Sequence, residues 1–189
     1  MKILVLDNYD SFTYNLVHYI EKCTNEKVAV VKNDQITIEE AAQFDKILLS
    51  PGPGLPIESG IMPELLKQLA PKKDILGICL GLQAIAENYG GKLKNLEKVF
   101  HGVATKIIVQ KSDLLFKDLP KEFLAGRYHS WVAENNSFPE ELEITAVDDD
   151  NNIMAVRHKK HNVRAVQFHP ESILTEHGEK MVENWVKGK

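Results

Sequence analysis

A cysteine flanked by glycines is the residue of this sequence best placed to do chemistry. The apolar segment 75–78 runs directly into Cys79, and Gly77 and Gly81 lie two residues away on either side. Glycines at these positions remove side chains that would collide in a sharp strand-to-helix turn, the backbone shape of a nucleophile elbow. A thiol at a helix N-terminus also meets the positive end of the helix dipole, which favours the nucleophilic thiolate. The alternative is a small buried residue in a glycine-rich turn.

A histidine near the other end of the chain could serve as the base for this thiol. His169 follows the apolar segment 163–167, and Pro170 separates it from Glu171. In an extended backbone, residues two apart face the same side, so Glu171 can orient the imidazole and stabilise its protonated form. Cys79, His169 and Glu171 would then form a nucleophile, base and carboxylate triad. A turn with a surface ion pair is the alternative interpretation of the histidine segment.

A loop of alternating proline and glycine follows the apolar segment 46–49. Proline has no backbone N–H group, so in segment 50–54, whose sequence is SPGPG, the glycines supply the free donors. Glycine also allows a ligand to approach the backbone closely. The loop could donate one N–H group to an oxyanion while Leu80, just after the cysteine, donates another. An ordinary loop is one alternative, and a phosphate cradle is the other, although the Gly-Lys-Ser/Thr ending of such a cradle is missing.

The order of apolar segments predicts a fold that brings these residues together. In the N-terminal half, short apolar segments alternate with segments of helical periodicity, which predicts an α/β fold with a doubly wound, mostly parallel sheet. The strands expected there are 3–6, 28–31, 46–49 and 75–78, with helices between them and over 82–89. Asp10 or Ser11 is expected to cap the first helix. Because ligands bind at the carboxyl ends of parallel strands, the cysteine turn and the proline–glycine loop are expected at one edge.

The C-terminal half has a different pattern. Beyond Gly91 the apolar segments are short and separated by turn residues, which predicts an added antiparallel or mixed β portion. The strands expected there are 106–109, 142–147, 153–157 and 163–168, and a last helix is expected over 178–187. The Asp/Asn run 148–152 is interpreted as a solvated hairpin turn, because it lacks the ligand spacing and the glycine of a calcium loop.

Length and composition set wider limits. A chain of 189 residues with 43% hydrophobic residues predicts a single domain, 1–189, with its own core. The net charge of −4 without a basic stripe argues against a nucleic-acid partner. Cys23 and Cys79 are too few for a disulfide framework, and no apolar run is long enough for a membrane span, so a reduced, cytoplasmic protein is expected. No close cluster of cysteine and histidine predicts a metal site.

Five segments together resemble the class I glutamine amidotransferases, most closely the small glutaminase subunits of anthranilate synthase and aminodeoxychorismate synthase. The segments are 7–15 (DNYDSFTYN), 50–54 (SPGPG), 77–83 (GICLGLQ), 127–131 (RYHSW) and 167–172 (QFHPES), and the resemblance covers nearly the whole chain. It implies a flavodoxin-like sheet. One departure is Leu82, where many relatives carry histidine, and this leucine is expected to pack rather than react.

The resemblance also implies a reaction and a site. Cys79 would attack the side-chain amide of L-glutamine, His169 and Glu171 would complete the triad, and hydrolysis of a glutamyl thioester would follow. Gly52 and Leu80 would donate to the oxyanion. The residues implied around the bound glutamine are Gly52, Pro53, Gly54, Gln83, Ser130 and Trp131. No cofactor or metal is implied.

The product ammonia implies a partner protein. Ammonia becomes ammonium at neutral pH and is then no longer a nucleophile, so a glutaminase of this size is expected to work docked to a synthase. The resemblance implies a chorismate-using partner, for which anthranilate synthase component I is the first expectation and the large subunit of aminodeoxychorismate synthase the alternative. A stand-alone thiol hydrolase and a regulatory subunit with an idle triad are the remaining hypotheses.

Overall fold

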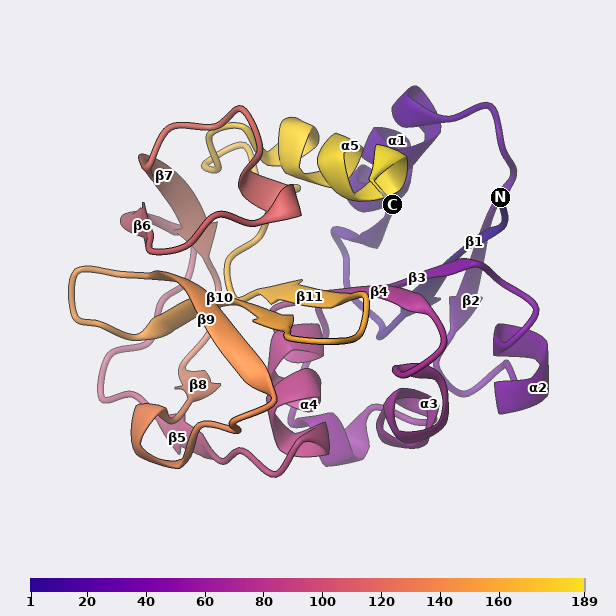
Figure 1. Ribbon diagram of the computed structural model, residues 1–189, viewed down its shortest axis with the longest axis horizontal. Helices are drawn as coiled ribbons and strands as arrows, with labels where there is room; N and C mark the ends of the chain where they lie inside the picture. Colours follow the sequence, from indigo (N-terminus) through magenta and orange to yellow (C-terminus); the bar gives the residue numbers. More distant parts are fainter. Residues whose placement is uncertain (189) are drawn as a thin grey trace.

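A nine-stranded sheet with helices on both faces organises the molecule (Figure 1). The computed structural model describes residues 1–188. The strand order is β2-β1-β3-β4-β11-β10-β9-β6-β7, and pairing is parallel from β2 to β11 and antiparallel from β11 onward. The parallel strands are β1 (Ile3–Asp7), β2 (Val28–Lys32), β3 (Lys46–Leu49), β4 (Asp74–Ile78) and β11 (Val163–Val166). The predicted parallel sheet with an antiparallel extension is confirmed.

Strand β1 shows why the sheet is covered on both sides. Ile3 and Val5 lie in one buried cluster with residues of α1 (Thr13–Cys23) and α5 (Gly178–Lys187). Leu4 and Leu6 lie in a second cluster with residues of α3 (Met62–Leu69) and α4 (Leu80–Asn88). Each of these side chains contributes about 1.5–3 kcal/mol through burial. The continuous apolar run of a parallel strand therefore reflects two cores, one above and one below the sheet in Figure 1.

The antiparallel extension lies on the side of the sheet away from the chain's first strands (Figure 1). Its strands are β10 (Ile153–His158), β9 (Leu142–Val147), β6 (Val103–Val109) and β7 (Glu122–Arg127). A separate antiparallel pair joins β5 (Leu93–Asn95) to β8 (Trp131–Ala133). The remaining elements are α2 (Ile38–Ala41) and the 3₁₀ turns η1 (Pro56–Glu58), η2 (Leu114–Phe116) and η3 (Asn135–Ser137). Strands β5, β7 and β8 were not predicted from the apolar pattern.

The start of α1 differs from the prediction. Neither Asp10 nor Ser11 caps the helix, because Phe12 takes the N-cap position and makes no side-chain cap bond. The Asp10 carboxylate instead accepts the N–H of Phe12 at 2.8 Å, outside the helix. Tyr9, with a φ of 63°, turns the chain at this point and displaces the helix start to Thr13.

The Asp/Asn run also needs a correction. It forms the turn between β9 and β10, but Asp148 and Asn152 are buried, with exposures of 4% and 6%. Asp148 accepts the backbone N–H of Asn152 at 2.8 Å and forms an ion pair with buried Arg127 at 2.7 Å. The turn is solvated only toward its tip, because the residues that adjoin the strands face a buried cation.

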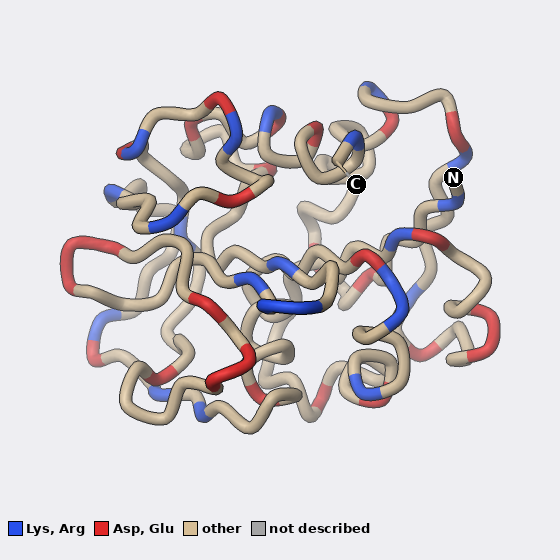
Figure 2. The backbone as a smooth tube through the Cα atoms, in the orientation of Figure 1, with Lys and Arg blue, Asp and Glu red and all other residues tan. Residues whose placement is uncertain are grey.

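Acidic and basic residues are interspersed along the chain (Figure 2). This distribution accompanies the modest net charge of −4. Among residues 1–188, no helix combines the length and apolar character that crossing a bilayer requires.

Candidate active site

The carboxyl ends of neighbouring parallel strands bring the candidate residues to one edge. Leu49 of β3 pairs with Gly77 of β4, and Ile78 of β4 pairs with Val166 of β11. Each strand continues directly into a segment singled out from the sequence. A cavity of about 350 Å³ lies there, lined by Gly52, Pro53, Gly54, Leu55, Cys79, Leu80, Gln83, Tyr128, His129, Ser130 and Trp131. The structure thus places the candidate nucleophile, both candidate oxyanion donors and every candidate glutamine contact around one cavity.

Cys79 sits on a sharp turn between β4 and α4. Its φ of 52° and ψ of −96° lie in a region that costs a non-glycine residue about 1–3 kcal/mol. The backbone N–H of Cys79 donates to the carbonyl of Val166 at 2.8 Å, which fixes the turn to the end of β11. A Cβ at Gly77 would lie only 2.7 Å from the backbone of Gly81. The flanking glycines therefore allow the strand and helix to approach as the sequence spacing predicts.

The sulfur of Cys79 is buried but not isolated from the cavity. The side chain is 6% exposed and lines the cavity wall. The amide nitrogen of Gln167 lies 3.4 Å from the sulfur and is positioned to donate to it. Gln167 itself is completely buried. It was not predicted as a site residue, although it precedes His169 by two residues, the same spacing that separates His169 from Glu171.

His169 and Glu171 form a buried pair. The imidazole Nδ1 lies 2.6 Å from the Glu171 carboxylate, and both side chains are almost inaccessible to solvent. The His169 backbone is held on both sides, because its N–H donates to Gly126 at 3.0 Å and its carbonyl accepts the hydroxyl of Thr175 at 2.5 Å. Within residues 1–188, Nε2 has no hydrogen-bond partner. This nitrogen is available for proton exchange.

The charge of Cys79 reaches His169. Burial alone would lower the pKa of His169, but the Cys79 thiolate and then the Glu171 carboxylate outweigh burial and raise this pKa well above 6.5. The ring of Tyr128 packs edge-on against the imidazole, with centroids 4.8 Å apart, and restricts its rotation. The arrangement can therefore stabilise a thiolate and an imidazolium at neutral pH.

A second histidine supports the cavity wall in its neutral form. Burial and the nearby Arg127 charge lower the pKa of His129 to about 3. Nε2 of neutral His129 accepts from Arg127 at 3.1 Å, so Nδ1 carries the proton and donates to the Trp131 carbonyl at 3.0 Å. The same carbonyl accepts the side-chain amide of Gln83 at 3.0 Å. Gln83 thus joins α4 to the wall formed by residues 128–131.

Arg127 is the buried charge behind this wall. Its side chain is 1% exposed, forms an ion pair with Asp148 at 2.7 Å and lies 3.6 Å above the ring of Phe100. Burial lowers the pKa of Arg127, and the Asp148 carboxylate opposes that effect. The role of Asp148 was not predicted, since the sequence does not distinguish one buried aspartate within a run of Asp and Asn residues.

The two candidate oxyanion donors face the same cavity. Leu80 is the first residue of α4, and Gly52 packs against it, since a Cβ at Gly52 would lie 3.1 Å from the Leu80 side chain. Neither backbone N–H donates a hydrogen bond to any residue of the described chain. Leu82, by contrast, is fully buried in the lower core, which confirms that it packs.

A metal-binding arrangement does not occur in the part of the chain that the structure describes. Within residues 1–188, no three histidine, cysteine, aspartate or glutamate side chains come together as a set that could hold a metal ion. The chemistry of the cavity is therefore considered from its thiol, imidazole, carboxylate and backbone N–H groups.

Similarity to known proteins agrees with this geometry. A model of the family "glutamine amidotransferase class-I" matches residues 4–188. The chain is 47% identical over 186 residues to anthranilate synthase component 2 of Lactococcus lactis, covering 97% of this chain and 93% of the relative. It is 44% identical over 188 residues to the bifunctional protein TrpGD of Thermotoga maritima, covering 98% of this chain but 32% of that protein, so it spans about a third of that relative's length.

Structural similarity extends over the whole described chain. A GMP synthase-type protein from Thermoplasma acidophilum superposes with a TM-score of 0.88 at 27% identity, covering 98% of this chain and 92% of that one. Sheet, elbow and cavity together define a glutamine-dependent amide-transfer scaffold. The chain belongs to the class I glutamine amidotransferase family.

The buried ion pair behind the wall gives a stability prediction. Asp148→Asn should lower the free energy of unfolding by about 3–5 kcal/mol, because it leaves the Arg127 charge buried without a counter-ion. Urea unfolding followed by circular dichroism measures this change. Asp149→Asn is the matched control, since Asp149 is exposed and pairs with Lys106 at the surface, where about 0–1 kcal/mol is expected. Equal losses in the two variants would contradict the assigned role.

The raised pKa of His169 gives a titration prediction. A raised value means that the ring stays protonated through neutral pH, so an NMR titration of the His169 imidazole should have its midpoint above 6.5. Cys79→Ala should move this midpoint down, and Glu171→Gln should move it down by less, because the thiolate has the larger effect. An unchanged midpoint in Cys79→Ala would show that the two side chains do not interact.

Proposed function

We propose that this protein is the glutaminase subunit of an anthranilate synthase. It hydrolyses L-glutamine to glutamate and ammonia and delivers the ammonia to a chorismate-using component I. The observation that carries the proposal is the combination of Cys79 on a strained elbow with the buried His169–Glu171 pair beside one cavity. The similarity to anthranilate synthase component 2 over 93% of that relative supports the choice of pathway.

The first half of the reaction forms a thioester. His169 holds the proton of the Cys79 thiol, and the thiolate attacks the side-chain carbonyl carbon of glutamine. The oxyanion of the tetrahedral intermediate accepts the N–H groups of Gly52 and Leu80, each of which contributes about 3–4 kcal/mol in comparable acyl-transfer sites. The C–N bond then breaks as His169 returns its proton to the nitrogen, and ammonia leaves.

The second half releases glutamate. A water molecule loses a proton to His169 and attacks the glutamyl thioester, and the same N–H groups stabilise the second oxyanion. The C–S bond breaks, which yields glutamate and restores the Cys79 thiolate with protonated His169. Glu171 stabilises the imidazolium in both halves through Nδ1, and it fixes Nε2 as the nitrogen that exchanges protons.

The cavity walls suit a small zwitterionic substrate. The candidate contacts are Gly52, Pro53 and Gly54 on one side and Ser130 and Trp131 on the other. Gln83 lies one turn after the nucleophile and holds the Trp131 carbonyl, so it supports the far wall as well as lining the cavity. These assignments favour recognition of the glutamine backbone by main-chain groups of two loops.

The test separates ammonia production from ammonia use. In the complex with anthranilate synthase component I, Cys79→Ser should lower glutamine-dependent anthranilate formation by at least about 100-fold, because the serine hydroxyl is a far weaker nucleophile at neutral pH. Synthesis from added ammonium should remain within about twofold of the parent complex. Anthranilate fluorescence measures both activities.

Cys23→Ser is the matched control for this substitution. Cys23 lies half-buried on α1, and its thiol donates to the Tyr19 carbonyl at 3.0 Å, a bond that a serine hydroxyl can replace. Both activities should be unchanged in this variant. Loss of ammonium-dependent synthesis in Cys79→Ser, or 4-amino-4-deoxychorismate as the product in place of anthranilate, would contradict the proposed function.

A further inference from the structure

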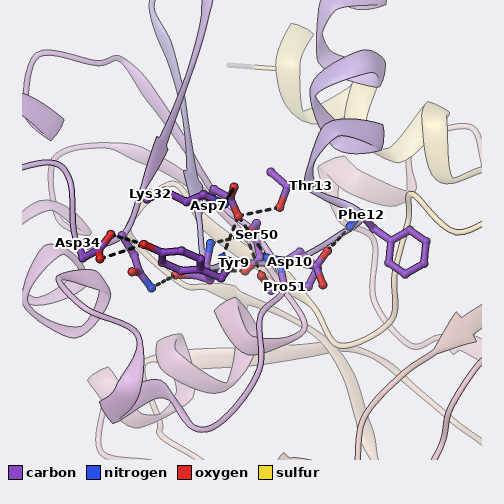
Figure 3. Close-up of polar contacts among 11 residues, drawn as sticks. Asp7, Tyr9, Asp10, Phe12, Thr13, Lys32, Asp34, Ser50 and Pro51 are labelled. Carbon is purple, nitrogen blue, oxygen red and sulfur yellow. Dashed lines mark hydrogen bonds and ion pairs between the residues drawn. The ribbon is translucent and has the colours of Figure 1, made fainter.

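The peptide that carries the Gly52 N–H group is held through its other end. Gly52 N–H and the Pro51 carbonyl belong to one planar trans peptide, in which N–H and C=O point in opposite directions. The hydroxyl of Ser50 donates to the Pro51 carbonyl at 2.7 Å (Figure 3). Any restraint on this carbonyl therefore also sets the direction of the Gly52 N–H group.

The direction of the Ser50 hydroxyl is itself fixed. Its oxygen accepts the backbone N–H of Asn8 at 2.9 Å. A hydroxyl has one proton, so with Asn8 on its acceptor side this proton goes to the Pro51 carbonyl. Ser50 is completely buried, and water does not compete for the bond.

Asn8 clamps the same loop in two further ways. Its side-chain amide donates to the Ser50 carbonyl at 2.8 Å and accepts from Asn33 at 3.0 Å, which leaves the amide orientation defined. Its backbone oxygen also lies against Gly52, where an added Cβ would come within 2.5 Å. Asn8 is 2% exposed, so both contacts are made in the interior.

The position of Asn8 is set by its neighbour Asp7. The Asp7 carboxylate accepts the N–H of Tyr9 at 2.9 Å and the hydroxyl of Thr13 at 3.1 Å, and it pairs with Lys32 at 2.5 Å (Figure 3). These bonds hold the turn after β1, in which Tyr9 adopts a φ of 63°. The end of β1 is thus the rigid support on which the loop after β3 is fastened.

Without such a restraint, a Pro-Gly peptide is free to rotate. Proline fixes its own φ but not ψ, and glycine permits both signs of φ, so the intervening peptide can turn over with little movement of its neighbours. A turned peptide would present the Pro51 carbonyl, not the Gly52 N–H, to an oxyanion. The Ser50 bond opposes this rotation.

We propose that Ser50 and Asn8 are positioning residues that aim the Gly52 N–H group at the oxyanion, with the Ser50 hydroxyl as the lock. The inference rests on the proposed glutaminase function, in which Gly52 is an oxyanion donor. It assigns the lock a role in the transition state, since the oxyanion exists only there and in the tetrahedral intermediates. Binding of the uncharged glutamine carbonyl depends on it much less.

The test is Ser50→Ala in the complex with component I, with glutaminase kinetics as the readout. The kcat should fall at least about tenfold, while the KM for glutamine should change less than about threefold, because a misdirected donor loses part of the roughly 10²–10³-fold contribution of one oxyanion donor. Alkylation of Cys79 by iodoacetamide, measured in the Cys23→Ser background, should keep its rate. That displacement forms a C–S bond and expels iodide without an oxyanion, so it reports an intact thiolate.

Ser59→Ala is the matched control. Ser59 is also buried in the segment after β3, and its hydroxyl also donates to a backbone carbonyl, that of Pro56, but it does not line the cavity. Its kcat should stay within about twofold of the parent. A similar kcat loss in both variants, or a slowed alkylation in Ser50→Ala, would mean that the loop has merely lost its structure and would overturn the inference.

Two further variants keep the outcomes distinct. If Ser50→Ala does not fold, Ser50→Cys retains the side-chain volume with a weaker donor, and the same selective fall in kcat is expected, while an unchanged kcat overturns the lock. Cys79→Ala reports on the proposed function: glutaminase activity that survives it refutes the thioester mechanism. Activity that Cys79→Ala abolishes but Ser50→Ala leaves intact refutes only the positioning role of Ser50.

Discussion

The parallel register of β4 and β11 is the constraint on which the candidate site depends. Ile78 pairs with Val166, and the Cys79 N–H donates to the Val166 carbonyl at 2.8 Å, so residues far apart in sequence share one sheet edge. Beyond that bond, β4 turns into α4 while β11 continues toward His169. A one-residue slip would send alternate side chains to the opposite face and would separate the thiol from the imidazole. The two apolar clusters on either side of the sheet prevent such a slip, since each strand must supply apolar side chains to both.

The sequence pattern predicted the elements whose signal is local and continuous. The observed bounds of β3, β9 and α5 coincide with the predicted segments, because each is a clear apolar run or helical stripe bounded by turn residues. Strands β5 and β8 have three residues each and pair only with one another, so their extended conformation is set by tertiary contacts. Strand β7 was missed because apolar positions there alternate with Glu122 and Gly126, and Gly126 packs tightly beneath Ser172.

The residues around the cavity could be predicted, whereas their supports could not. Glycine spacing around Cys79 and the two-residue alternation from His169 to Glu171 are visible in the sequence and lead to the observed geometry. The buried pair of Arg127 and Asp148 joins two strands of the antiparallel extension, and no local pattern announces a pairing across such a distance. The Ser50 hydroxyl and the Asn8 amide have the same difficulty. Their function depends on which carbonyl each contacts, and this is settled only when β1 and β3 lie side by side.

The two histidines near the cavity show how position decides charge within one fold. His129 and His169 are both buried, and burial lowers the pKa of each. Next to His129 stands the Arg127 guanidinium, which adds to the effect of burial, so the ring stays neutral and can accept a hydrogen bond from that cation. Next to His169 stand a thiolate and a carboxylate, which reverse the effect of burial. The wall therefore keeps one protonation state across the neutral range, because the pKa of His129 is about 3, and a pH dependence of catalysis near neutrality reports on the Cys79–His169 pair and not on the shape of the cavity.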